Sequence, residues 1–162
     1  MSDPVNAQRR LLSVVAEYLA GTGSAADLSQ AAALALTRYE DPPEPIVALA
    51  GVAPSASYDE LDPLARAAVR DMGYPELTLA FRSKVLALDL AQDVVAGNVP
   101  AGVGASQLWE TGRYTDEGAD QFGVFSELAD EWESNLEKRG ELEVEIRQNA
   151  SQIVAETGNS LA

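Results

Sequence analysis

The sequence predicts an all-α protein, folded as a single-domain bundle of about six to seven helices. Along most of the chain, apolar residues recur every three or four positions, which is the spacing of one helix face. Apolar residues make up 46% of the composition, but many are alanine and only 6% are aromatic. This balance suits closely packed helices better than strands. At 162 residues the chain has the usual size of one domain, so we expect residues 1–162 to share one core.

Four helices are expected in the first half of the chain. The first begins at about Pro4 and ends at the glycines of AGTG. Ser24 resembles the start of a capping pair that opens a second helix, which continues until DPPEP. The segment IVALAG favours a short helix that ends at Gly51. The SYDE stretch at 57–60 is a capping box, and the helix that it starts ends at Gly73.

A central helix is expected from about Pro75 to Ala96, because its apolar side chains occupy two nearly opposite faces. A helix that is apolar on two faces is buried between neighbours. The first face carries Phe81, Val85, Leu88 and Val95, and the second carries Leu79, Leu86, Leu90 and Val94.

The polar strip of this central helix carries Arg82, Asp89 and Asp93. The two aspartates lie one turn apart and could share a divalent ion or line a small pocket together with Arg82. Two carboxylates alone make a poor cation site, since calcium takes six to eight oxygen ligands. A charge pair or a solvated strip explains these residues better, although they are the ones to test for an enzyme or a ligand-binding domain.

The stretch AGNVPAGVGASQLWE is rich in glycine but has no phosphate-binding signature. A Walker-type loop needs a lysine and a hydroxyl residue after its last glycine, and here Gly104 is followed by alanine. A structural role accounts for more of its residues. We expect Gly97 to end the central helix in the left-handed conformation and Pro100 to lie in the first turn of the next helix. Gly102 and Gly104 would let two helices approach closely.

The last third predicts a hairpin of two long helices separated near Gly140. Trp109 and Trp132 are expected to pack inward, as large aromatic residues at helical spacing normally do. The apolar stripe of the first hairpin helix comprises Phe122, Phe125, Leu128, Trp132 and Leu136, and that of the second comprises Leu142, Ile146, Ala150 and Ile153.

This hairpin also carries most of the negative charge. Between Glu110 and Glu145, twelve acidic residues against three basic ones leave nine negative charges out of a net charge of −15. Like charges one turn apart, such as Glu127 with Glu131 and Glu133 with Glu137, weaken a helix. The face serves either solubility or the docking of a basic partner by long-range attraction. The candidate partner-binding residues are Asp120, Glu127, Asp130, Glu131 and Glu137.

Composition removes several classes of function. The net charge of −15 disfavours nucleic acid and anionic membranes as partners, because like charges repel. Without histidine or cysteine the chain cannot build the usual zinc sites or a histidine-based catalytic triad. We therefore expect no catalytic residues, no metal and no cofactor. The beginning of the sequence lacks the pattern of a secretory leader, and no apolar run reaches membrane-spanning length, so a cytoplasmic location is expected.

Three segments, PPEPIVALAG, DVVAGNVPAGVGASQLWE and FSELADEWE, resemble a group of small, acidic, all-helical bacterial proteins of uncharacterised function. In general character the chain is also similar to acidic helical immunity proteins that block basic toxins. The second resemblance implies binding to a basic protein and no catalysis.

The leading hypothesis is a non-catalytic interaction protein of the immunity or inhibitor type. Its acidic hairpin would bind a basic protein, such as a toxin, and act by occlusion. One alternative is an inhibitor that mimics a nucleic-acid backbone, which requires carboxylates spaced like phosphates. The other is a carboxylate-based enzyme or ligand-binding domain that uses Arg82, Asp89 and Asp93. The oligomeric state is open.

Overall fold

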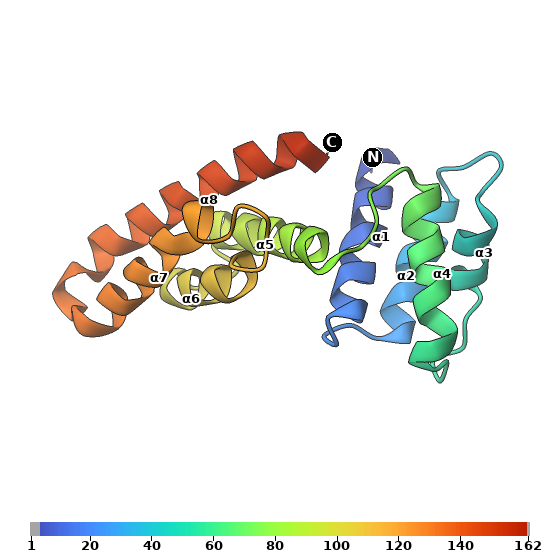
Figure 1. Ribbon diagram of the computed structural model, residues 1–162, viewed down its shortest axis with the longest axis horizontal. Helices are drawn as coiled ribbons and strands as arrows, with labels where there is room; N and C mark the ends of the chain where they lie inside the picture. Colours follow the sequence, from blue (N-terminus) through green and yellow to red (C-terminus); the bar gives the residue numbers. More distant parts are fainter. Residues whose placement is uncertain (1–3, 162) are drawn as a thin grey trace. The chain divides into compact units, whose positions relative to one another are not determined.

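The computed structural model describes residues 4–161, and within this range it contains eight α-helices, one short 3-10 helix and no β-strand (Figure 1). The predicted all-α class is confirmed, while the expected number of six to seven helices was slightly low. Two compact units divide the chain, one ending at Thr78 and the other beginning at Leu79. That the chain forms a single domain stays a prediction.

The first unit contains four helices, which pack as α1 on α2 and α4, and α3 on α2 and α4. They are α1 (Pro4–Leu19), α2 (Ala25–Leu36), α3 (Glu44–Ala50) and α4 (Tyr58–Asp71). The four helices therefore close around one core, seen in blue to green in Figure 1. Its fully buried side chains include Leu11, Leu12, Leu28, Ile46, Leu49 and Leu61.

Both predicted serine caps are confirmed. The Ser24 side chain accepts a hydrogen bond from the backbone N–H of Asp27, and the Asp27 side chain accepts from the backbone N–H of Ser24. Ser57 and Glu60 form the same reciprocal pair at the start of α4. Each pair satisfies two N–H groups that the helix itself leaves without partners.

Two helix boundaries differ from the prediction. Helix α2 ends at Leu36 rather than at DPPEP, because the Thr37 hydroxyl donates to the Leu34 carbonyl at 2.7 Å and the chain leaves through a tight turn. Helix α5 begins at Leu79 rather than at about Pro75. The Leu77 side chain is buried, and Arg66 donates to the Leu77 carbonyl at 3.2 Å, so the segment before α5 is held against α4 without helical structure.

The second unit contains helices α5 (Leu79–Ala96), α6 (Ala101–Gly112), α7 (Gly118–Ser134) and α8 (Arg139–Leu161), with the 3-10 helix η1 (Leu136–Lys138) between the last two. Helix α5 packs on α6 and α8, and α6 packs on α7. Helices α7 and α8 run in opposite directions as the predicted hairpin (Figure 1).

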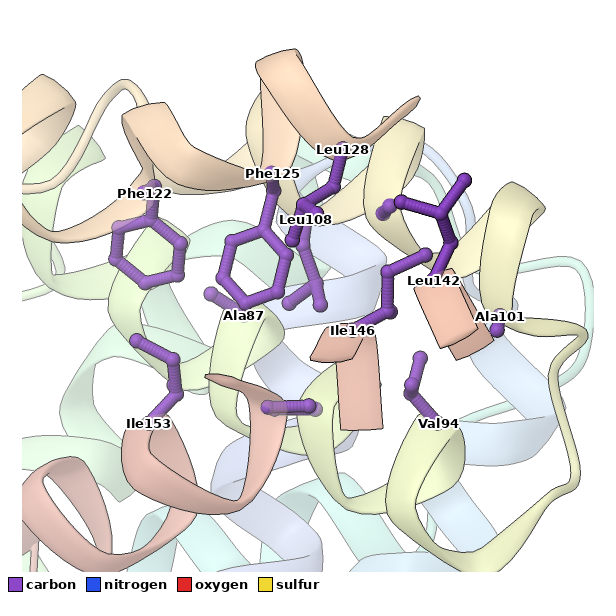
Figure 2. Close-up of a cluster of buried hydrophobic side chains, with 13 residues drawn as sticks. Ala87, Val94, Ala101, Leu108, Phe122, Phe125, Leu128, Leu142, Ile146 and Ile153 are labelled. Carbon is purple, nitrogen blue, oxygen red and sulfur yellow. The ribbon is translucent and has the colours of Figure 1, made fainter. Parts of the chain in front are cut away.

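The core of the second unit is formed where the side chains of α7 point toward α8 and α5 (Figure 2). Helix α5 contributes mainly small side chains, including Ala87, Ala91 and Val94. The expected burial of two opposite faces of α5 is only partly correct, since Leu79 is 53% and Val95 is 41% exposed. The larger core residues are Leu108, Phe122, Phe125, Leu128, Leu142, Ile146 and Ile153.

The glycine stretch shapes the joint between α5 and α6. Gly97 has a φ of +80°, which confirms the predicted left-handed end of α5. A β-carbon at Gly104 would collide with Val94 of α5, and one at Gly102 would collide with Trp132 of α7. The predicted close approach of helices is therefore confirmed. Pro100 is the N-cap of α6 rather than a residue of its first turn, because its ψ of 138° lies outside the helical range.

The hairpin turn lies earlier than predicted. Asn135, with φ −134° and ψ 82°, ends α7, whereas Gly140 is already the second residue of α8. Leu136 was expected on the apolar stripe of the first hairpin helix, but it lies beyond the end of α7 and is 69% exposed. Both errors have the same cause, because a break in the helix at Asn135 also breaks its periodicity.

Among the helices that the structure describes, from residue 4 to residue 161, none combines the length and the apolar character that a membrane span requires.

Candidate partner-binding face

The five acidic residues predicted to bind a partner are all exposed and follow one stretch of the second unit. Four of them lie on α7, but Glu137 was wrongly placed on the same helix. It lies in η1, because α7 ends at Ser134. We call this set the acidic ridge: Asp120, Glu127, Asp130, Glu131 and Glu137.

Helical periodicity separates the acidic ridge from the core. Phe122, Phe125 and Leu128 are buried on one side of α7. With 100° per residue, Glu127 lies on the opposite side, and Asp120 and Glu131 lie within about 40° of Glu127. The buried phenylalanines thus fix the helix whose outer face carries the carboxylates.

Few cations neutralise the acidic ridge. Lys138 lies 3.3 Å from Glu131. Among the residues that the structure describes, Asp120, Glu127, Asp130 and Glu137 form no ion pair. From Leu79 onward, fifteen acidic residues against six basic ones leave nine negative charges. The ridge therefore carries a strong negative potential.

A groove of about 480 Å³ lies beside the acidic ridge, between the first half of α7 and the second half of α8. Val124 and the buried Ile153 give it an apolar floor, and carboxylates and carboxamides form its edges. We call it the hairpin groove. It is lined by Glu117, Asp120, Gln121, Val124, Asn149, Gln152, Ile153 and Glu156.

Hydrogen bonds hold Glu156 in place at this groove. Gln152 Nε2 donates to Glu156 Oε1 at 2.9 Å, and Gln121 Nε2 of α7 donates to Glu156 Oε2 at 2.9 Å. The hydrogen bonds from Gln152 and Gln121 lower the pKa of Glu156, because they favour its charged form. At the end of the groove that Glu117 lines, Lys84 Nζ lies 3.7 Å from Glu117 Oε1.

A second groove, of about 460 Å³, lies between the first half of α6, the end of α7 and the start of α8. Its wall is the half-buried indole ring of Trp132, which occupies the space left by Gly102. Arg139 donates to the Trp132 carbonyl at 3.0 Å, and its guanidinium lies 5.3 Å from the indole centre. We call this the tryptophan groove; Val103, Ser106, Gln107 and Glu133 complete it. Trp109 and Trp132 pack against the core, as predicted, but both remain half-buried.

The other predicted group, on α5, is spread along a partly exposed strip. Arg82 and Asp89 are half-buried, and Asp93 is exposed. Asn98 donates to Asp93 Oδ1 at 3.2 Å, so Asp93 helps to close the turn after α5. The hairpin groove and the tryptophan groove are both lined by other residues. Within residues 4–161, no three acidic side chains gather in a way that would hold a metal ion.

Sequence reasoning missed the amide side chains of the hairpin groove. Gln121 and Glu156 are separated by 35 residues and meet only because α7 and α8 fold back on each other. The spacing of Asn149, Gln152 and Glu156 does indicate one polar face of a helix, but it does not reveal what that face lies against.

Compared with protein-family models, curated proteins and solved structures, the chain matches none of them.

Proposed function

We propose that the second unit is a non-catalytic docking module whose acidic ridge binds a basic protein partner. The observation that carries this proposal is the exposure of five carboxylates, four of them on α7 and Glu137 just beyond its end, of which only Glu131 has an ion pair among the described residues. A carboxylate that serves only solubility does not need other negatively charged side chains beside it. Clustering raises the potential above the face and speeds the approach of a positively charged protein.

The net charge supports a basic protein as the class of partner. A chain with a net charge of −15 repels phosphate backbones and anionic lipid surfaces, whereas it attracts a basic protein. The hairpin groove and the tryptophan groove, which both include residues of α7, offer the apolar contacts that long-range attraction does not supply. Binding of this kind acts by occlusion, as in proteins of the immunity or inhibitor type, with a basic toxin as one suitable partner.

The decisive experiment compares two charge-reversal variants as bait in the cell of origin. The ridge variant changes Glu127, Asp130 and Glu137 to lysine. The control variant changes three exposed residues outside the helices, Glu40, Asp41 and Glu76, to lysine as well. It therefore alters the net charge by the same amount as the ridge variant. The wild-type chain and the control variant are expected to retain the same basic protein, and the ridge variant is expected to lose it.

Kinetics then test the mechanism with the retained protein. The association rate of the wild-type chain is expected to fall steeply as salt rises, and that of the ridge variant to be slower and nearly independent of salt. Circular dichroism of both variants checks that the helices persist, since lysine is a good helix former. A partner that is not basic, or one that binds the ridge variant with unchanged kinetics, would contradict the proposal.

A further inference from the structure

We propose that the hairpin groove is the docking subsite for an arginine-bearing segment of the basic protein partner. The inference deepens the proposed function and rests on it. The acidic ridge brings the partner to this face, and the groove provides the place where one basic side chain and its backbone are seated.

The shape of the groove supports a peptide segment as the occupant. Its volume of about 480 Å³ lies within the range of about 300–1,000 Å³ that small-ligand pockets occupy. There is room for a long side chain together with the main chain that carries it. Val124, which is half-buried beside the buried Ile153, can cover the methylene groups of an arginine, which are apolar although the end of the side chain is charged.

The edges of the groove complement the charge and the hydrogen bonding of this occupant. Glu117, Asp120 and Glu156 provide three carboxylates, and Lys84 offsets part of the charge at Glu117. A guanidinium has five N–H donors in a planar fork, so it needs several acceptors around it. The carboxamides of Asn149 and Gln152 can both donate to and accept from a peptide backbone.

The acceptor at Glu156 is already oriented. Gln121 holds one carboxylate oxygen from α7, and Gln152 holds the other from the same helix. Each oxygen keeps a second lone pair for an incoming donor. A group fixed before binding loses less conformational entropy when the partner arrives, so the bridge between α7 and α8 favours tight seating.

A hexa-arginine peptide tests the subsite directly. Its affinity for the full chain is measured by calorimetry at low salt. Asp120→Asn and Glu156→Gln each remove one charge at the groove, while Asp130→Asn and Glu141→Gln remove one exposed charge away from it. The groove variants are expected to weaken binding about tenfold, because each loses a charged hydrogen bond. The other two are expected to weaken it about twofold, as exposed charges do.

Val124→Trp fills the groove without changing any charge and is expected to abolish peptide binding; an unfolding curve checks that the fold persists. Equal weakening by all four carboxylate variants would overturn the groove while leaving the acidic ridge as the docking face. Failure of the peptide to bind the wild-type chain would also overturn it. The same calorimetry is repeated with spermine in place of the peptide. If spermine binds as tightly as the peptide, and the same variants weaken its affinity to the same extent, the occupant is a polyamine and not a peptide.

Discussion

Gly102 of α6 lies directly against the indole ring of Trp132 of α7, with no space for a β-carbon between them. The contact joins two helices of the second unit and also forms the wall of the tryptophan groove. Because Trp132 is on the helix that carries the acidic ridge, one glycine sets both the packing of α7 and the shape of the surface beside the ridge.

Gly102→Ala is expected to destabilise the second unit by roughly 1–3 kcal/mol, because the new methyl group displaces the indole from its seat. Urea unfolding followed by tryptophan fluorescence measures the loss. The matched control is Gly123→Ala in α7, where a β-carbon meets nothing within 4 Å. That change should stabilise by roughly 0.5–1 kcal/mol, since alanine favours a helix over glycine. Equal stability of the two variants would contradict the close packing of Gly102 against Trp132.

Gly104 makes the corresponding contact with Val94 of α5, and the prediction is one of coupling. Gly104→Ala alone overpacks the joint, and Val94→Ala alone leaves a cavity, because Val94 is fully buried. In the double variant the alanine at 104 occupies space that the valine vacated. The double variant should therefore lose less stability than the two single changes together, by about 1 kcal/mol. Strict additivity in chemical unfolding would exclude the contact.

Much of the fold could be predicted because its signals are local. The side chains of Ser24 and Ser57 mark the starts of helices through hydrogen bonds to residues three positions away. Gly97 marks the end of a helix through its own positive φ angle. The start of α5 was predicted wrongly because a more distant contact decides it. Leu77 is held against α4 by Arg66, eleven residues earlier, and so delays the start of α5.

The candidate site was predictable to a smaller extent. Exposure of Asp120, Glu127 and Asp130 follows from the period of α7, once the buried phenylalanines on the opposite side are recognised. The hairpin groove depends instead on how α7 and α8 pack, and no local pattern specifies which of their polar faces become neighbours. Glu137 shows the limit of periodicity, since it was extrapolated past the break at Asn135.

Glu127 and Glu131 are both exposed on α7, one turn apart, so their repulsion weakens the helix that carries the ridge. Glu127→Gln is expected to raise the free energy of unfolding by about 0.2–0.5 kcal/mol at low salt. The gain should shrink at 1 M salt, where charges are screened within about 3 Å. Thermal unfolding at two salt concentrations measures both effects. A loss of stability at low salt would show that Glu127 makes a favourable interaction instead.

The hydrogen bonds to Glu156 predict how its carboxyl group titrates. Gln152 and Gln121 lower its pKa below the ordinary value of 4.5, with the larger effect from Gln152. A carboxyl group whose pKa is lower in the folded state contributes stability above the pH at which the unfolded chain titrates. That contribution disappears as the pH falls through the folded-state pKa.

Gln152→Ala should raise the pKa of Glu156 toward 4.5, and Gln121→Ala should raise it by a smaller amount. Carbon-13 NMR of the Glu156 carboxyl group during an acid titration measures each value. If neither variant moved the titration midpoint, the two amides would not hold the carboxylate in solution, and the pre-oriented acceptor of the hairpin groove would lose its basis.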